Sequence, residues 1–246
     1  MKNKNLNILK CFFIMLICLN GISCGDSDDN IQPDSSAPGL DKESEAIVNK
    51  YKEKRILMGR WEYTGYGKSD FVFLSDGTCL LDGKQTTGYT VGIWDYNQEN
   101  SLLSTTCGSW SWTINLLTET QWSGISPGGN AFSYKRGYWN DPNDELLVGK
   151  WINEDSNISI EFKANNEYTI TDAGTQLNGN YEVETYSPSD WNDKYKYCRY
   201  MYLTGDISGK MRVNYLDGYR LVFDSYEGAS TTAPYKLTYI YSDFIN

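Results

Sequence analysis

The chain has 246 residues and a formal net charge of −10, from 32 acidic and 22 basic side chains. This charge disfavours binding to nucleic acid or to an anionic membrane surface, because both attract proteins through basic side chains. The chain contains no histidine, which excludes Ser-His-Asp and Cys-His catalysis and removes the commonest general base and zinc ligand. We therefore expect no cofactor, and the 20 Tyr and 8 Trp favour a β-rich fold.

The amino terminus has the features of a secretion signal. A lysine-containing leader carries an apolar run over residues 8–19, which suits a signal peptide and is too short to span a membrane. Small residues then precede Cys24, and the segment resembles a bacterial lipoprotein signal, in which the cysteine becomes the first mature residue and carries acyl chains. The resemblance implies a signal peptide over 1–23 and a lipid anchor at Cys24. The alternative is ordinary cleavage after Ser23, which gives a secreted protein.

Residues 24–40 are rich in Asp and Ser and poor in apolar residues, so we expect an acidic disordered tether. The acidic run at 25–30 resembles the export tag of Bacteroidota surface lipoproteins. This resemblance implies an outer membrane lipoprotein, displayed on the cell surface or on the periplasmic face.

A short helix is expected over 41–56. Asp41 can cap its start, and Ile47, Val48 and Tyr51 fall on one face. We expect this helix to pack on the open end of the first domain.

A short motif that occurs twice indicates two folding units. Leu-Met-Gly-Arg-Trp at 57–61 recurs as Leu-Val-Gly-Lys-Trp at 147–151, 90 positions later. A repeat of this length predicts tandem domains. We expect a first domain over 57–139, a linker over 140–145 and a second domain over 146–246.

Alternation of apolar and polar residues predicts the strands. Trp110, Trp112, Ile114 and Leu116 alternate with polar residues, which predicts a strand with this face buried. Asp-Gly at 76–77 is a hairpin signal, and the second unit has Asn-Asn at 165–166, where Asn tolerates positive φ. Each unit is therefore predicted to be a small up-and-down antiparallel barrel or sandwich.

These motifs resemble the lipocalin-like domains of Bacteroidota lipoproteins. The resemblance rests on Leu-x-Gly-x-Trp in both units, and in the first unit on the motifs at 73–78, 92–94 and 117–122. It implies two tandem lipocalin-like barrels, each with a first-strand glycine passing close under the barrel and a tryptophan plugging its floor. These residues are Gly59, Trp61, Gly149 and Trp151.

The same resemblance implies an arginine of the last strand over the plugging tryptophan. Arg136 fits this part in the first unit. The second unit has Lys236 in its last strand but no arginine there.

The irregular segment 187–197 is the best candidate ligand site in the sequence. It places aromatic rings among polar side chains, which suits the apolar faces and hydroxyl groups of a sugar. The candidate binding residues are Asp190, Trp191, Asn192, Tyr195 and Tyr197. The alternative is a loop folded back so that Trp191 covers its own barrel.

Two runs of polar residues offer oxygen atoms to calcium, but neither has the glycine and spacing of a known calcium loop, so we expect no metal site. These runs contain Asp190, Asn192 and Asp193, and Asp141, Asn143 and Glu145. Cys79 and Cys107 lie in one unit of a chain expected in an oxidising compartment, so they form either a disulfide or a pair of buried thiols.

We expect a non-enzymatic cell-envelope lipoprotein that binds a glycan or a small amphiphile. The alternative is a protein-interaction module, such as an accessory subunit or an inhibitor. A carboxylate-dependent glycosidase is a third hypothesis, with Glu182 and Glu184 as the candidate acids. It is disfavoured because two acids on one strand face do not oppose each other across a cleft.

Overall fold

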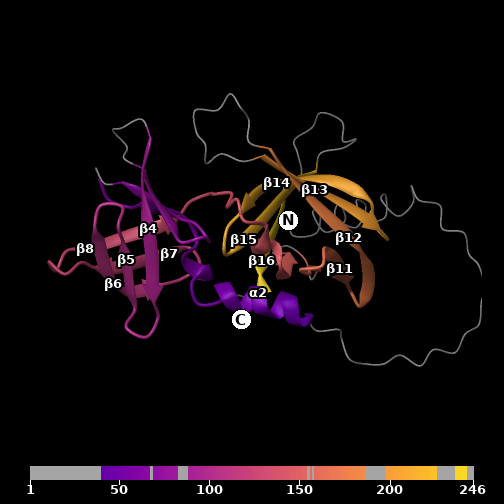
Figure 1. The fold of residues 1–246 in the computed structure, drawn as a ribbon, viewed down its shortest axis with the longest axis horizontal. Coiled ribbons are helices and arrows are strands. Elements are labelled where there is room, and N and C mark those ends of the chain that lie inside the picture. The colour runs from indigo at the N-terminus through magenta and orange to yellow at the C-terminus, as the bar shows by residue number, and fades with distance from the viewer. Residues whose placement is uncertain are drawn as a thin grey trace, which may run out of the picture.

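The computed structural model describes residues 40–66, 69–82, 88–153, 156, 158–186, 198–225 and 236–242. Within them the chain forms two closed antiparallel barrels of eight strands each, which we call barrel 1 and barrel 2 (Figure 1). Sequential strands pair in each barrel, and the first strand pairs with the last. The prediction of an all-β chain with two tandem up-and-down barrels is therefore confirmed.

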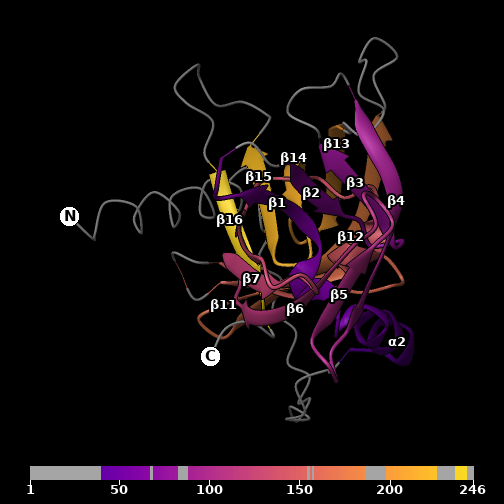
Figure 2. The same cartoon turned by 90° about the vertical axis from the view of Figure 1, so that its left-hand side faces the viewer.

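Barrel 1 can be followed round its strands in Figure 2, which turns it toward the viewer. Its strands are β1 (Gly59–Tyr63), β2 (Asp70–Phe73), β3 (Thr78–Asp82), β4 (Tyr89–Asn97), β5 (Leu102–Thr105), β6 (Trp110–Leu117), β7 (Gln121–Ile125) and β8 (Ala131–Arg136). Those of barrel 2 are β9 (Gly149–Asn153), β10 (Ser159–Phe162), β11 (Glu167–Asp172), β12 (Thr175–Tyr186), β13 (Cys198–Gly205), β14 (Gly209–Leu216), β15 (Arg220–Ser225) and β16 (Lys236–Tyr241).

The described interior of each barrel is filled by large side chains rather than hollow. In barrel 1 the side chains that are at most 4% exposed include Trp61, Phe71, Phe73, Trp94, Trp112, Trp122 and Tyr134. In barrel 2 they include Trp151, Phe162, Tyr168, Met201, Phe223 and Tyr241. Burial of these rings is the main source of stability for both barrels.

The helix before the barrels is α2 (Lys42–Tyr51), and Asp41 caps it as predicted, since its carboxylate accepts from the Ser44 amide at 2.8 Å. The helix does not lie on the open end of barrel 1, so that prediction is wrong. Ser44 Oγ accepts from the amide of Ala164 in barrel 2 at 2.9 Å, and the helix contacts β9. A 3-10 turn, η1 (Arg55–Leu57), then leads into β1.

The predicted linker is packed between the barrels. Asp141 is 1% exposed, and its carboxylate accepts from the Ser75 amide at 2.8 Å and from the Ser75 hydroxyl at 2.9 Å. Asn140 bridges to Leu216 of barrel 2, and a second 3-10 turn, η2 (Asp144–Leu147), precedes β9. The segment therefore joins both barrels through its own contacts.

Local backbone geometry explains where the strand prediction succeeded and failed. Gly77 and Asn166 both have positive φ, at 87° and 66°, as expected for their hairpins. Leu116, however, is 42% exposed, contrary to the predicted buried face. The register between β6 and β7 shifts between Ile114 and Leu116, and this bulge turns Leu116 outward.

Candidate functional site

The floor of barrel 1 is closed by a tryptophan beneath an arginine. Trp61 is fully buried and donates from Nε1 to the Leu57 carbonyl at 2.6 Å. The Arg136 guanidinium carbon lies 4.3 Å from the Trp61 ring centroid, and the side chain donates to the carbonyls of Ile56 and, at 2.7 Å, Met58. Arg136 therefore has the place that the sequence resemblance implied.

Barrel 2 obtains the corresponding arginine from outside its own strands. Trp151 donates to the Leu147 carbonyl at 2.7 Å, and its partner in the last strand is Tyr241. The Arg55 guanidinium carbon lies 3.6 Å from the Tyr241 ring centroid and 5.3 Å from that of Trp151. Arg55 also donates to the Leu146 carbonyl at 2.5 Å. The turn before barrel 1 therefore completes the floor of barrel 2.

First-strand glycines make room for these floors. Gly149 has a φ of +122°, and a Cβ there would lie 2.6 Å from Cε2 of Tyr241. Gly59 has a φ of +113°, and a Cβ there would lie 3.0 Å from Cβ of Asp217. A side chain at either position would therefore combine backbone strain with crowding.

A buried charge cluster joins the two barrels at these floors. Asp217 of barrel 2 is fully buried, and it lies 3.6 Å from Nη1 of Arg136 and 3.3 Å from Nη2 of Arg220. Burial lowers the pKa of Arg136 to about 10, against the opposing effect of the Asp217 carboxylate. The closed end of barrel 1 thus faces barrel 2, and its mouth is at the other end.

The mouth of barrel 1 contains an open depression of about 470 Å³, which we call the cup. It is lined by Ser69, Ser109, Trp110, Ser111, Trp112, Ser126, Pro127 and Phe132. Aromatic rings alternate with serine hydroxyls in this set, and none of these lining residues is charged. Such a lining suits a neutral ligand that has both apolar faces and hydroxyl groups.

Strand length explains why Trp110 is available at the cup. The last pair of β6 and β7 toward the mouth is Thr113 with Ile125, so β6 runs on from Trp110 to Trp112 beside β5 alone. Trp110 is 39% exposed, contrary to the prediction that its whole strand face is buried. Its ring packs edge-on against Phe71 and Trp112, with centroids 5.5 and 5.9 Å away. These contacts fix the ring at the rim before any ligand arrives.

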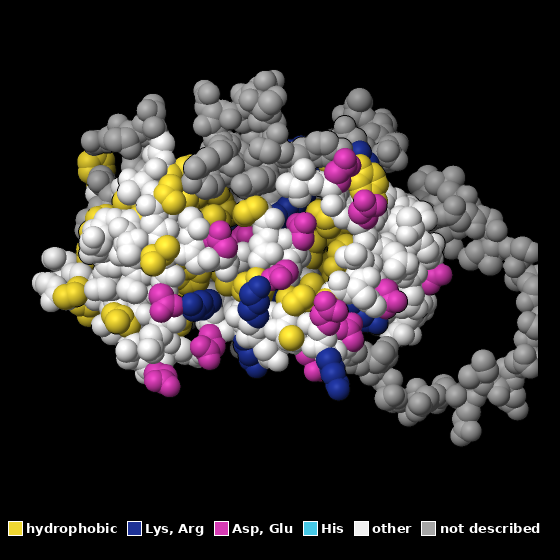
Figure 3. Space-filling view, viewed as in Figure 1, with side chains coloured by type: hydrophobic (Ala, Val, Ile, Leu, Met, Phe, Trp, Pro, Cys, Tyr) yellow, Lys and Arg dark blue, Asp and Glu magenta, His cyan; other side chains and the backbone are white. Residues whose placement is uncertain are grey.

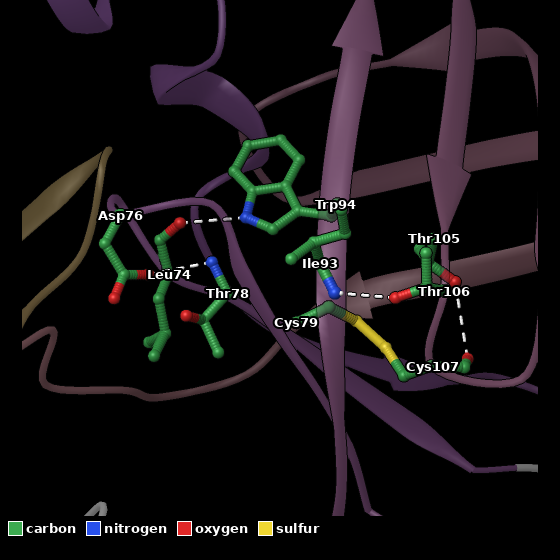
Figure 4. Close-up of a disulfide and its surroundings, with 9 residues drawn as sticks. All are labelled: Leu74, Asp76, Thr78, Cys79, Ile93, Trp94, Thr105, Thr106 and Cys107. Atoms are coloured by element: carbon green, nitrogen blue, oxygen red, sulfur yellow. Dashed lines mark hydrogen bonds between the residues drawn. A yellow bond between two sulfur atoms is a disulfide. The ribbon is translucent and has the colours of Figure 1, made fainter.

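A disulfide positions the loop that carries the rim of the cup. Cys79 and Cys107 form a disulfide and both are fully buried (Figure 4). Of the two alternatives that the sequence allowed, the structure therefore has the disulfide and not the pair of buried thiols. The bond crosses β4 at Gly92, where a Cβ would lie 2.5 Å from the amide nitrogen of Cys107. Ser109 follows with a φ of 53°, directly before Trp110. The loop therefore has a fixed anchor within three residues of the exposed ring.

Two hydrogen-bond donors lie below the cup. Trp122 and Tyr134 are stacked with centroids 4.4 Å apart, and Trp122 also packs against Trp112 of the lining. Trp122 Nε1 and the Tyr134 hydroxyl are buried and have no hydrogen-bond partner among the described residues. Burial, followed by the neighbouring Tyr63 and Asp70, raises the pKa of Tyr134 and keeps it a neutral donor.

A second hollow, of about 320 Å³, lies between α2, η2 and β12, and its acids are mostly engaged. Glu145 Oε2 lies 2.7 Å from Nζ of Lys50, and Asp144 lies 3.3 Å from Nε of Arg199. Among the described residues no group of three His, Cys, Asp or Glu side chains could hold a metal ion. This hollow is therefore explained by the packing of the helix on barrel 2.

The proposed glycosidase pair does not form a catalytic arrangement. Glu182 and Glu184 are both exposed and lie two residues apart on β12, so they share its outer face. Glu184 accepts a hydrogen bond from the hydroxyl of Tyr202 on the neighbouring strand at 2.8 Å. The two carboxylates do not face each other across a cleft.

Several candidates from the sequence fall outside the described residues. These are Cys24 and the ligand candidates Asp190, Trp191, Asn192, Tyr195 and Tyr197. The calcium candidates of the linker are described: Asp141 bonds to Ser75, and Asn143 accepts from the Glu145 amide at 3.1 Å. The cup was not found from the sequence, because regular alternation placed Trp110 in the core.

The chain matches no protein-family model and no curated protein. Among the residues described, none of the helices is long and apolar enough to cross a membrane. The functional argument therefore depends on the chemistry of the cup.

Proposed function

We propose that this chain is a non-enzymatic binding module of the cell envelope, and that barrel 1 binds a neutral saccharide at its cup. One observation carries the proposal: a fixed, partly exposed Trp110 ring stands among serine hydroxyls, with no charged residue in the lining. A pyranose ring offers apolar C–H faces for such a ring and hydroxyls for the serines.

A saccharide fits this site better than a small amphiphile. An amphiphile needs an apolar cavity in which to bury its chain, as in barrels that enclose a ligand. The interior of barrel 1 is filled by Trp61, Phe73, Trp94 and their neighbours. A shallow cup over a packed core holds a flat polar ring more readily than an acyl chain.

A glycan screen tests the proposal. The full-length chain, purified in detergent, is applied to an array of neutral and acidic glycans, and bound glycans are then measured in solution. We expect binding to neutral glycans and at least about a tenfold loss with Trp110→Ala, which corresponds to about 1.4 kcal/mol. Trp110→Phe should retain more affinity than Trp110→Ala, because it keeps an aromatic ring.

The matched control is Ile93→Ala, which removes an apolar side chain that is 65% exposed on the outside of β4. This variant should bind as the wild type does. A blank array, or wild-type affinity in Trp110→Ala, would overturn the proposal.

We also propose that acylated Cys24 attaches the chain to the outer membrane, on the cell surface or the periplasmic face. The support is the amino-terminal sequence, in which a basic leader and an apolar run precede Cys24. Growth with an alkyne-labelled fatty acid should label the wild type but not Cys24→Ser. Protease treatment of intact cells then distinguishes the two faces, since only surface protein is cleaved. Equal labelling of both proteins would exclude this anchor.

A further inference from the structure

The part of barrel 1 next to the cup is almost free of charge. Between Ser101 and Tyr134, Glu119 is the only charged residue, although charged residues make up 22% of the chain. This stretch contains β5, β6 and β7. In Figure 3 the end of barrel 1 farthest from barrel 2 has white and yellow atoms, whereas acidic and basic side chains gather nearer the junction.

The outward side chains of β5, β6 and β7 form what we call the uncharged face. The register places Leu102, Thr113 and Ile125 in one row across the three strands. In the neighbouring row Leu116 lies opposite Ser123, whose hydroxyl bonds to the Asn115 amide oxygen at 2.8 Å. Apolar and hydroxyl or amide side chains thus alternate over the face.

The uncharged face is continuous with the cup. Ser111 of β6 lines the cup and stands directly across from Ser104 on β5. On the other side, Ser126 and Pro127 of the cup follow Ile125 in the chain. A ligand that leaves the cup between β6 and β7 therefore passes onto this face.

Composition favours a neutral sugar polymer over a second copy of the chain as the occupant. The exposed apolar residues of the face are Leu102, Leu116 and Ile125, at 37%, 42% and 43%. They are separated by Thr113 and Ser123, so they do not form the contiguous apolar centre of a stable dimer interface. A polysaccharide alternates C–H patches with hydroxyls on the same scale, and β5, β6 and β7 contain no charged residue.

We infer that barrel 1 binds an extended neutral polysaccharide, with one sugar unit in the cup and the following units along the uncharged face. This inference rests on the proposed function and specifies its ligand class. The cup supplies stacking on Trp110, and the face adds weaker contacts that accumulate with chain length.

A chain-length series tests this inference separately from the cup. The probes are disaccharides and hexasaccharides of β-glucan, β-mannan and α-glucan, each titrated into the full-length chain in detergent. The wild type should bind the hexasaccharide of one of these glycans at least tenfold more tightly than its disaccharide. Leu116→Glu, which places a charge on the face at an exposed position, should remove that gain and leave disaccharide binding unchanged. Gln176→Glu adds the same charge at an exposed site of barrel 2 and should keep the gain.

The outcomes separate the two proposals. Disaccharide binding that requires Trp110 but does not increase with length would support the cup and overturn the extended site. A length gain that survives Leu116→Glu would also overturn it. Sedimentation velocity provides the last check, since a dimer that Leu116→Glu dissociates would assign the face to a second copy instead.

Discussion

Arg55 and Arg136 donate to carbonyl groups at equivalent positions of the two barrels. Arg136 donates to Ile56 before β1, and Arg55 donates to Leu146 before β9, 90 positions further along the chain. Arg136 belongs to the barrel that it closes, whereas Arg55 precedes barrel 1 and closes barrel 2. Barrel 2 in turn supplies Asp217 to Arg136. Each barrel therefore completes the floor of the other.

Removal of Arg55 should destabilise barrel 2 more than barrel 1. Arg55→Ala deletes hydrogen bonds from a buried cation to the carbonyls of Leu146 and Gly218, so we expect the free energy of unfolding to fall by about 2–4 kcal/mol. Hydrogen exchange should show the larger loss of protection in β9 and β16. Lys54→Ala, at a side chain that is 41% exposed, is the control and should change little. If β1 and β8 lose as much protection as β9 and β16, Arg55 does not act mainly on the floor of barrel 2.

Neutralising Asp217 should weaken the junction between the barrels. Asp217→Asn keeps the shape of the side chain but leaves the buried charge of Arg136 without its nearby carboxylate, so we expect a loss of about 3–5 kcal/mol. Denaturant unfolding followed by tryptophan fluorescence measures this loss. Asp206→Asn is the control, since Asp206 is exposed in the turn between β13 and β14. If both variants lose the same stability, the charge cluster has no special part in the junction.

The fold was largely predictable from the sequence because its signals are local. The Gly-x-Trp repeat located both floors, and the hairpin signals at Gly77 and Asn166 matched positive φ values. The floor of barrel 2 was not predictable, because Arg55 is separated by 91 positions in sequence from Leu146, to which it donates. No local pattern connects the two.

The cup and the uncharged face beside it were missed because the pairing of β6 with β7 decides which side chains are exposed. Alternation placed Trp110 inside, but β6 extends past its pairing with β7, and that depends on the partner strand. The bulge before Leu116 likewise turned a predicted core residue outward. The signal that was available is the uncharged stretch from Ser101 to Tyr134, which contains three of the four serines that line the cup: Ser109, Ser111 and Ser126.

Loss of the disulfide should lower both stability and affinity at the cup. Replacing Cys79 and Cys107 together by alanine opens a crosslink with a sequence separation of 28, and we expect a loss of about 3 kcal/mol. The loop before Trp110 would lose its anchor, so saccharide binding should weaken even where the variant remains folded. Titration well below the unfolding midpoint separates the two effects. Unchanged binding in the folded variant would show that the Trp110 contacts with Phe71 and Trp112 are sufficient.

Stability should fall steeply above pH 10. Burial raises the pKa of Tyr181 to about 12 and also raises those of Tyr134 and Tyr239. Tyrosines in the unfolded chain lose their protons near pH 10, so between pH 10 and 12 the unfolded state binds fewer protons than the folded one. The stabilisation is therefore complete below pH 10 and is lost at about 1.4 kcal/mol per pH unit for each such tyrosine.

Arg136 acts in the opposite direction, because its lowered pKa of about 10 makes the folded state release a proton first. Three tyrosines outweigh this single arginine, so the net slope of unfolding free energy against pH should be negative. Tyr181→Phe removes one of these titrating groups and should make the slope less negative. Tyr66→Phe, at a fully exposed side chain, should leave the slope unchanged. Denaturant titrations at intervals from pH 8 to pH 11.5 measure the slope. A flat profile, or equal effects of the two variants, would show that the burial of Tyr181 does not cause the loss of stability at high pH.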